Sequence, residues 1–334
     1  MYISVVMASW NGEKYIEQQL DSLRLQTRVP DEVIISDDAS TDHTWEILRK
    51  YQKKWPEMPV TLYQNSSNTG YRKNFQRALS CCTEKSTGQD ALFMFCDQDD
   101  IWLPDKVATV EKLFAHHPET EVLASSFVLI DAEGERLPDR TAKGWSNQHL
   151  YHRNVAADAL VRVPADDLIY HNFAQGCALT FRPLIRDRFL RNFTDSIPHD
   201  WQIAMLGAAE DGLWFYNHPL FQYRIHDSNA LGLHADTSGG KINEGYRTIE
   251  AELSAAFLLW VRKTFPDIYE NDRRMQKAEA FLREDIRCIR ERDARGLLRI
   301  LRSPEYGKLK SKKAALADLA SVILPKNSAR TRKT

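Results

Sequence analysis

The sequence predicts an α/β fold in which a mostly parallel central sheet is flanked by helices and followed by a helical C-terminal extension. Three observations predict it. Short apolar runs rich in β-branched residues alternate with helical spacings over roughly the first 130 residues. Strand–helix–strand order of this kind builds parallel sheets with helices on both faces. Beyond about residue 241, almost every segment has helical periodicity.

Individual elements follow from the same patterns. The clearest strands are the apolar runs Ile3–Ser9, Val33–Ser36, Val60–Tyr63, Ala91–Cys96 and Val122–Ile130. Between them, helical spacing is found at Tyr15–Leu25, Asp42–Trp55, Tyr71–Cys82 and Pro104–His116. In the second half we predict strands at Gly176–Phe181 and within Leu213–Ile225, an amphipathic helix at Trp201–Ala209, and helices at Glu250–Lys263 and Asp272–Arg292.

Composition and charge argue against several classes of protein. The 334 residues carry 45 basic and 46 acidic side chains, so no overall positive field indicates nucleic acid as a partner. The five cysteines are odd in number and include no CxxC pair, which disfavours a disulfide framework or a zinc site and suits a reducing cytoplasm. We see no secretory signal and no apolar run of about 18 residues that would span a membrane. We therefore expect a cytoplasmic protein.

Adjacent carboxylates follow two of the predicted strands. Asp37 and Asp38 come after the second, and Asp97, Asp99 and Asp100 come after the strand at Ala91–Cys96. Ligands of open parallel sheets bind outside the carboxyl ends of the strands. Crowded, desolvated carboxylates are unfavourable unless a cation or hydrogen-bond donors meet them. The pattern therefore predicts a Mg²⁺ or Mn²⁺ site, since these ions bind carboxylates together with phosphate oxygens.

Helix capping is the alternative explanation for these acids. An acid between a strand and a helix is often a simple N-cap. Asp99 or Asp100 could cap the turn that leads to Trp102, and Asp42 could cap its own helix. Two acidic clusters at the same sheet edge are harder to explain in this way than one.

The second half contains one strong candidate for a general base. His199 and Asp200 precede a predicted helix, and an ionised aspartate can accept a proton at neutral pH. Asp200 could equally be the N-cap of that helix, and the two roles are compatible. His226 ends an apparent strand and is more simply structural, whereas Arg224 would suit a diphosphate leaving group.

Short motifs occur in a fixed order over roughly residues 1–230. The most specific is Phe95–Trp102. The others are Val6–Gly12, Ile35–Asp42, Asn68–Gly70 with Asn74 and Phe75, Gly176-Cys177, His199–Trp201 and Tyr223–His226. Together they make the chain resemble family 2 glycosyltransferases, which have the Rossmann-like GT-A fold, and most of all the bacterial rhamnosyltransferase-like branch.

This resemblance implies a role for each matching position. Asp38 would hold the base or ribose of a nucleotide-sugar donor. The other expected donor-binding residues are Ala8, Trp10, Asn11, Asp37, Asn68, Asp97 and Arg224. Asp97 and Asp99 match the DXD motif, whose second acid binds the metal. The expected metal ligands are Asp99, Asp97 and His226.

Asp200 matches the catalytic base of the inverting members. Many members have a glutamate where this chain has His199, which leaves open which of the two side chains removes the proton. The expected acceptor-side residues are Gly176, Cys177, His199 and Trp201.

The resemblance implies an inverting hexosyltransferase that depends on Mn²⁺ or Mg²⁺ and acts in polysaccharide biosynthesis. The first expectation is transfer of rhamnose from dTDP-rhamnose to a hydroxyl of a surface-glycan or lipid-linked saccharide, and a UDP-hexose is the alternative donor. Two other classes, a sugar nucleotidyltransferase and a non-catalytic sugar-binding protein, are disfavoured. A nucleotidyltransferase would have a glycine-rich loop with Arg and Lys after the first strand, and this chain has none there. A non-catalytic binding protein would not need Asp97, Asp99 and Asp200 together.

We expect two domains. Residues 1–235 would be the catalytic domain, with a nucleotide-sugar half at about 1–130 and an acceptor half at about 131–235. Residues 236–334 would be a helical region with a basic tail, since ten Lys or Arg and two acids lie between Arg299 and Thr334. This region could pack on the catalytic domain, form a dimer, or touch anionic lipid at the inner face of a membrane.

Overall fold

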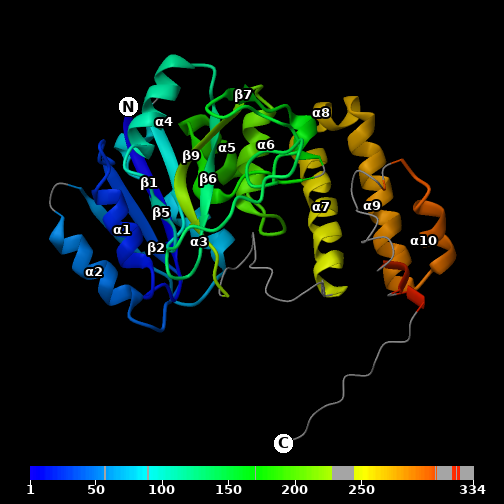
Figure 1. Ribbon diagram of the computed structural model, residues 1–334, viewed down its shortest axis with the longest axis horizontal. Coiled ribbons are helices and arrows are strands. Elements are labelled where there is room, and N and C mark those ends of the chain that lie inside the picture. Colours follow the sequence, from blue (N-terminus) through cyan, green and yellow to red (C-terminus); the bar gives the residue numbers. More distant parts are fainter. Residues whose placement is uncertain are drawn as a thin grey trace, which may run out of the picture. The chain divides into compact units, whose positions relative to one another are not determined.

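The computed structural model describes residues 1–55, 58–88, 90–169, 171–227, 244–304, 306, 318–320 and 322–323. The chain divides into two compact units. The first comprises Met1–Leu168 and Asn172–Ala235, and the second comprises Ile169–His171 and Asp236–Thr334. The first unit contains the sheet, and the described elements of the second are all helices (Figure 1).

Nine strands form a single sheet in the order β3-β2-β1-β4-β8-β6-β9-β5, and β7 pairs with β9. Their bounds are β1 Tyr2–Ser9, β2 Glu32–Asp37, β3 Val60–Gln64, β4 Ala91–Cys96, β5 Ile101–Trp102, β6 Val122–Ile130, β7 Leu160–Arg162, β8 Leu179–Phe181 and β9 Leu213–Arg224. The pairings make β1, β2, β3, β4, β6 and β9 run in one direction. The three short strands β5, β7 and β8 run the opposite way. The predicted α/β class with a mostly parallel sheet is confirmed.

Helices cover both faces of this sheet (Figure 1). On one face, α1 (Ile16–Arg24), α2 (Thr44–Lys54) and α4 (Lys106–His116) share a single apolar core with the strands. On the other, α3 (Tyr71–Ser80), α5 (Pro183–Asn192) and α6 (His199–Ala208) contact one another. Because both faces are covered, β2 and β4 are buried along their whole length.

Two elements of the second half differ from their sequence predictions. The predicted strand at Gly176–Phe181 starts with a 3₁₀ turn, Gly176–Ala178, and only its last three residues form β8. The helix predicted as amphipathic, α6, is buried on all sides because it packs between α5 and the strands β6 and β9. Two further 3₁₀ turns lie at Glu84–Thr87 and Ala165–Leu168.

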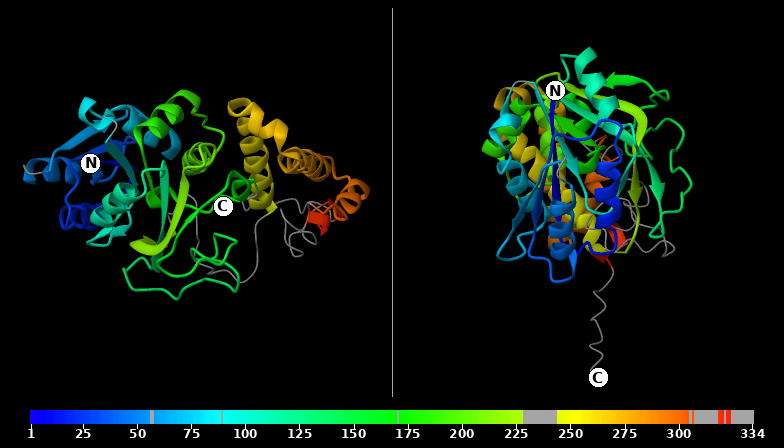
Figure 2. Two further views of the ribbon diagram at one scale, coloured as in Figure 1. Left: turned by 90° about the horizontal axis from the view of Figure 1, so that it is seen from above. Right: turned by 90° about the vertical axis from the view of Figure 1, so that its left-hand side faces the viewer.

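The second unit is built from α7 (Glu244–Thr264), α8 (Pro266–Asn271), α9 (Arg273–Glu291) and α10 (Ala294–Ile300), drawn from yellow to orange in Figure 2. Its buried apolar side chains include Phe257, Leu258, Val261, Met275, Leu282 and Leu297. Helices α7 and α9 are in contact, and so are α9 and α10. None of the described helices combines the length and the apolar character that crossing a bilayer requires. Most of the predicted basic tail lies outside the described residues.

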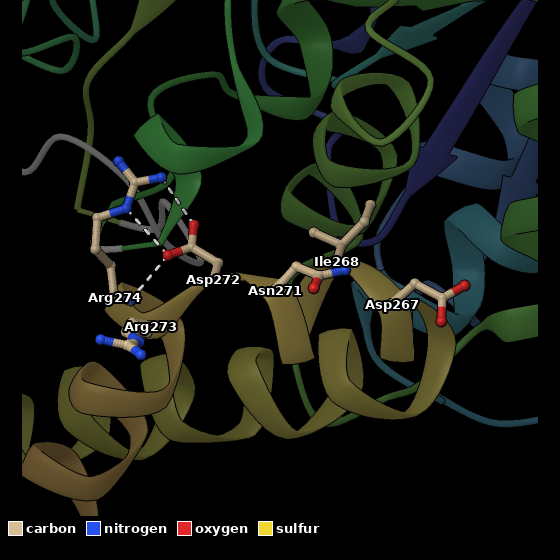
Figure 3. Close-up of a pocket in the computed structure, with 6 residues that line it drawn as sticks. All are labelled: Asp267, Ile268, Asn271, Asp272, Arg273 and Arg274. Carbon is tan, nitrogen blue, oxygen red and sulfur yellow. Dashed lines mark hydrogen bonds and ion pairs between the residues drawn. The ribbon is translucent and has the colours of Figure 1, made fainter.

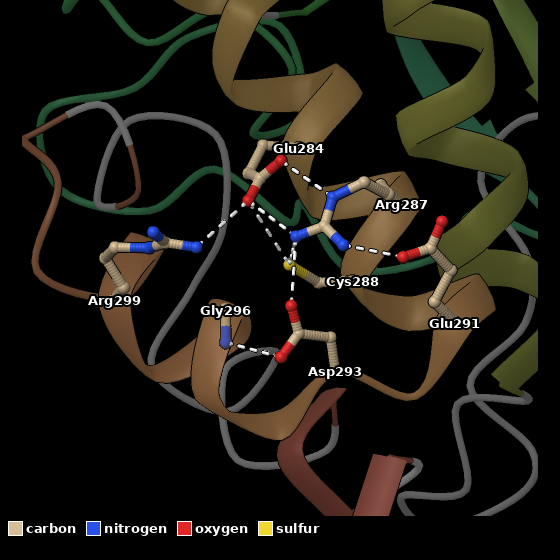
Figure 4. A network of polar contacts seen from close by, with 7 residues as sticks. All are labelled: Glu284, Arg287, Cys288, Glu291, Asp293, Gly296 and Arg299. Atoms are coloured by element: carbon tan, nitrogen blue, oxygen red, sulfur yellow. Dashed lines mark hydrogen bonds and ion pairs between the residues drawn. The ribbon is translucent and has the colours of Figure 1, made fainter.

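Charged side chains fix the ends of these helices. The Arg287 guanidinium bonds Glu284 (2.8 Å), Glu291 (2.6 Å) and Asp293 (3.0 Å) in the network of Figure 4. The Asp293 carboxylate also accepts the Gly296 N–H (2.8 Å) and so caps α10. Exposed ion pairs contribute little individually, so this network mainly orients the α9–α10 connection.

A pocket at the α8–α9 junction is lined by Ile268 and by five charged or polar residues, Asp267, Asn271, Asp272, Arg273 and Arg274 (Figure 3). Its Asp272 caps α9 by accepting the Arg274 N–H (2.8 Å) and also binds the Arg274 guanidinium (2.9 Å). Asp272 therefore stabilises the N-terminus of α9. The acids that follow the strands β2 and β4 belong to the first unit.

The packing of α6 on β6 provides a test of the fold. A Cβ added to Gly207 would lie 2.5 Å from Cγ2 of the buried Val122, so the helix needs glycine for this close approach. We expect Gly207→Ala to lower the free energy of unfolding by about 1–3 kcal/mol through overpacking. Chemical denaturation measures this change. Adding Val122→Ala should remove part of the loss; a double variant that is destabilised by the full sum of the two single effects would contradict the proposed packing.

Candidate active site

The loop after β1 is held to the loop after β4 by one side chain. Gln98 accepts the Trp10 N–H and donates to the Trp10 carbonyl, both at 2.9 Å. A Cβ on Gly12 would lie 2.2 Å from the Gln98 side-chain oxygen, so any larger residue there would displace the Gln98 amide. Trp10 is 50% exposed, which leaves an open aromatic surface at this edge of the sheet. Sequence reasoning assigned no role to Gln98.

The buried Asp37 carboxylate connects the ends of neighbouring strands through hydrogen bonds. Its carboxylate accepts the hydroxyls of Ser9 (3.0 Å) and Ser40 (2.5 Å), the Ser40 N–H (3.0 Å) and the Gln64 amide (3.2 Å). These residues come from β1, from β3 and from the loop after β2. Asp37 thus joins the loop after β2 to β1 and β3. The donor-binding role expected for Asp37 stays a prediction.

Asp38 anchors the Asn68–Gly70 turn ahead of α3. Its carboxylate accepts the N–H groups of Thr69 (2.9 Å) and Gly70 (2.8 Å) and the Asn65 amide (2.6 Å), and it is almost fully buried. The Asn68 side chain accepts the Gly70 N–H at 3.1 Å. The expected contact of Asp38 and Asn68 with a nucleoside stays a prediction.

The base-pocket positions expected beside Trp10 lie in the same region. Ala8 is partly exposed near the end of β1. Asn11 has a left-handed backbone (φ 48°), donates its N–H to Ser40 (2.9 Å) and accepts the Thr41 N–H (2.8 Å). The loops after β1 and β2 are therefore joined into one surface.

The acids after β4 point in different directions. Asp100 is buried and accepts the Arg224 N–H at 3.0 Å, which fixes the loop to the end of β9. Asp99 lies closer to the surface, and its carboxylate is 2.9 Å from Nε2 of His226. The N-cap position of α4 is Asp105, so neither acid caps that helix.

Asp97 lies among other negative charges. Burial, together with the charges of Asp99 and Asp200, raises the pKa of Asp97 to about 7. Burial also raises the pKa of Asp200 to about 6, against the opposing effect of hydrogen bonds from Trp201 and Asn172. Burial and the Asp200 charge raise the pKa of the Tyr71 hydroxyl to about 12. The end of β4 and the starts of α3 and α6 therefore meet at one acidic site.

Asp200 is in the first turn of α6, whose N-cap position is Pro198, so the expectation that Asp200 is the N-cap is wrong. Its carboxylate accepts the N–H of Trp201 at 2.7 Å. An acid in the first turn is favoured by the helix dipole, which partly offsets the unfavourable burial.

The sequence matches the family model for glycosyl transferase family 2 over residues 4–189. This chain belongs to glycosyl transferase family 2. A dTDP-rhamnosyl transferase of Shigella flexneri, RfbG, is 25% identical over 228 residues, which are 68% of this chain and 73% of RfbG. An uncharacterized protein of Mycobacterium tuberculosis is 30% identical over 227 residues, 67% of this chain. That match spans 59% of the relative's own length.

Solved structures show the same fold. A crystal structure of Staphylococcus aureus TarS, residues 1–349, aligns with a TM-score of 0.53 and 16% identity over 97% of this chain and 81% of that one. The expected GT-A fold of this family 2 member is thereby confirmed.

Arg224 does not have the position expected for a residue that binds a diphosphate. It is 1% exposed, and its guanidinium donates to the Asp99 carbonyl (2.7 Å), the Asp131 and Ala132 carbonyls (3.2 Å each) and the Gln18 side chain (2.6 Å). Its role in this structure is to hold the loop that carries Asp99. The sequence could not show this, because it does not reveal which way the last side chain of a strand points.

His199 is a core residue rather than a base. Its ring stacks on Phe75 (4.4 Å) and contacts Phe95 (5.2 Å), and burial lowers its pKa to about 3. The acceptor-side position expected for His199 stays a prediction, and the imidazole itself is buried. A Cβ on Gly176 would lie 2.6 Å from Nε2 of His199, so the glycine makes room for the imidazole and not for an acceptor.

Cys177 and Trp201 are also buried, and the acceptor-side role expected for them stays a prediction. Cys177 is fully buried, and the Trp201 indole donates to the Leu168 carbonyl at 3.0 Å. Both side chains belong to the layer beneath the site.

Lys106 is a buried cation that sequence reasoning missed. Its ammonium donates to the Cys177 carbonyl (2.7 Å) and lies over the rings of Trp102 (3.9 Å) and Phe221 (4.4 Å). Burial lowers its pKa to about 8. A signal was present, since Lys106 lies on the same face of α4 as the apolar Val110.

A second group of possible metal ligands lies close to Lys106. Side-chain atoms of Asp97, Asp100 and Cys177 approach within 4.8 Å of one another. Burial raises the pKa of the Cys177 thiol well above its usual range, so it stays protonated and is a poor ligand for a hard cation. Lys106 already brings a positive charge to this group. We therefore expect the cation at Asp99 and His226, which are more exposed.

The raised pKa of Asp200 predicts that removing its charge makes the folded protein more stable at neutral pH. Because the folded-state pKa exceeds 3.8, the folded wild-type protein is penalised once pH rises above about 4, and fully so above about 6. In EDTA at pH 7.5, Asp200→Asn should therefore be more stable than wild type by roughly 1–3 kcal/mol, and at pH 4 equally stable. Denaturant unfolding at both values measures this.

The matched control is Asp187→Asn, which changes a half-exposed carboxylate on α5. Its stability relative to wild type should hardly depend on pH. If Asp200→Asn is the less stable protein at pH 7.5, burial does not disfavour the ionised Asp200 carboxylate in the folded protein.

Proposed function

We propose that this chain is an inverting glycosyltransferase that uses a divalent cation and a nucleotide-diphosphate sugar. The observation that carries the proposal is the meeting of Asp97, Asp99 and Asp200 at one site, with raised pKa values at Asp97 and Asp200. Membership of family 2 supports the reaction class. We also propose that residues 1–130 bind the donor and residues 131–235 the acceptor.

The residues fit a divalent cation. Oδ2 of Asp99 and Nε2 of His226 are 2.9 Å apart, so one ion could take both as ligands, with Asp97 beside them. A set that mixes nitrogen and oxygen favours Mn²⁺ over Mg²⁺, since Mg²⁺ prefers oxygen ligands. Bound there, the cation would neutralise charge on the leaving diphosphate.

Asp200 is the proposed base. Its pKa of about 6 leaves the carboxylate ionised at neutral pH yet basic enough to accept a proton. As Asp200 takes the proton of an acceptor hydroxyl, that oxygen forms a bond to the anomeric carbon. The bond from this carbon to the diphosphate oxygen breaks on the opposite face, and nucleoside diphosphate departs. A single displacement inverts the anomeric configuration.

The donor proposed first is dTDP-rhamnose, supported by the likeness to RfbG. UDP-hexoses are the alternative. The proposed acceptor is a hydroxyl of a surface-glycan or lipid-linked saccharide. We propose that the basic C-terminal region brings the protein to the inner face of the membrane, or pairs two copies.

A thermal-shift panel of nucleotide-sugars with Mn²⁺ or EDTA tests the proposal. We expect one donor to raise the unfolding temperature by a few degrees in Mn²⁺ only, since a ligand at a hundred times its Kd contributes about 2.7 kcal/mol. Asp99→Asn should abolish the shift because the proposed cation loses a ligand, whereas Asp187→Asn should keep it.

The released product identifies the reaction. Nucleoside diphosphate supports glycosyl transfer, whereas pyrophosphate would indicate a nucleotidyltransferase. If no nucleotide-sugar stabilises the protein, or if the shift is the same in EDTA, the proposed function is wrong.

A further inference from the structure

Three consecutive residues without glycine adopt a left-handed backbone in the second half of the first unit. Asn147, Gln148 and His149 have φ values of 53°, 55° and 71°. Left-handed helical geometry costs an L-residue roughly 1–2 kcal/mol, and such residues usually occur singly. The buried Oδ1 of Asn147 also has no hydrogen-bond partner in the described part of the chain. Strain of this kind persists only where the surroundings enforce it.

The surroundings of this turn are built to enforce it. Ser146 and Tyr151 close its base with two backbone hydrogen bonds of 2.8 and 3.1 Å. The buried Gln148 amide accepts the Arg140 N–H (2.8 Å) and donates to the Phe127 carbonyl (3.2 Å). These bonds fix the conformation from beneath.

The strained backbone brings His149 against Trp145. The two ring centroids are 4.3 Å apart, with 35° between the ring planes, and the ring of His152 lies edge-on 6.2 Å from Trp145. Both histidines are exposed and Trp145 is partly exposed. The polar side chain of Arg153 next to His152 is 52% exposed. The turn thus presents an aromatic surface bordered by hydrogen-bond donors.

Hydrogen bonds connect this surface to the proposed base. The Asn147 amide donates to the Phe173 carbonyl at 2.7 Å. The residue before Phe173 is Asn172, whose side chain hydrogen-bonds the Asp200 carboxylate. The turn and the base are therefore held by two consecutive residues of one segment.

We propose that Trp145 and His149 form a stacking subsite for a sugar ring of the acceptor. The C–H face of a pyranose is apolar and flat enough to pack on such rings, while its hydroxyls can bond polar groups at the edge. The subsite lies within residues 131–235, the half proposed to bind the acceptor, and Asn147 of the turn bonds the residue that follows Asn172. This inference rests on the proposed function.

Binding of simple glycosides tests the subsite without requiring turnover. The probes are methyl α-glycosides of glucose, N-acetylglucosamine and rhamnose, observed by saturation-transfer NMR. At least one should receive saturation at its ring C–H protons from the wild-type protein. Trp145→Ala should weaken that glycoside's binding roughly threefold to tenfold, and Trp145→Phe should retain most of it.

The variant His149→Gly removes the imidazole ring without destabilising the turn, so it distinguishes a binding defect from a folding defect. Glycine adopts a φ of 71° without strain, so the unfolding temperature should not fall, yet the glycoside should bind more weakly. Asp158→Gly is the matched control, since it relieves another left-handed residue (φ 61°) outside the turn and should bind as wild type does.

The subsite is wrong if no glycoside binds the wild-type protein, or if Trp145→Ala and His149→Gly bind as the wild type does. The nucleotide-sugar panel uses a different ligand at different residues, so the proposed function and the subsite can fail separately.

Discussion

Burial of neighbouring carboxylates is the constraint on which this site depends. The chain brings Asp97, Asp99 and Asp200 together from two distant segments, and burial opposes the ionisation of Asp97 and Asp200. Either protons or a cation must compensate them. Under the proposed function, the site would bind an anionic diphosphate only together with a cation. Donor binding and cation binding would then be coupled through the same carboxylates.

Three basic side chains are buried around these acids, and each is accommodated differently. Arg224 is surrounded by backbone carbonyls and Gln18, Lys106 lies between aromatic rings and a carbonyl, and burial keeps the His199 imidazole neutral. None is exposed enough to meet a substrate in this structure. Arg224 holds the loop that carries Asp99, Lys106 bonds the Cys177 carbonyl, and His199 packs its helix on Phe75 and Phe95. The site thus has a layer of buried basic side chains beneath the partly exposed carboxylates of Asp99 and Asp200.

The sequence predicted the strands, the acids that follow them and the family, because these are properties of position along the chain. It did not predict which way neighbouring side chains point. Adjacent helix residues differ by about 100°, so His199 enters the core while Asp200 faces the acidic site. Arg224 ends a strand, and only the assembled loops determine that it points inward. The turn at Asn147–His149 could not be read at all, since no glycine marks its left-handed backbone.

One divalent cation bound at Asp99 and His226 is central to the proposed chemistry. Crystals grown with Mn²⁺ and a nucleoside diphosphate allow the ion to be located directly by its anomalous scattering. We predict one peak roughly 2–2.5 Å from Oδ2 of Asp99 and from Nε2 of His226, with a diphosphate oxygen on the same ion. A bound nucleotide with no peak there, or a peak at Asp97, Asp100 and Cys177, would contradict this assignment.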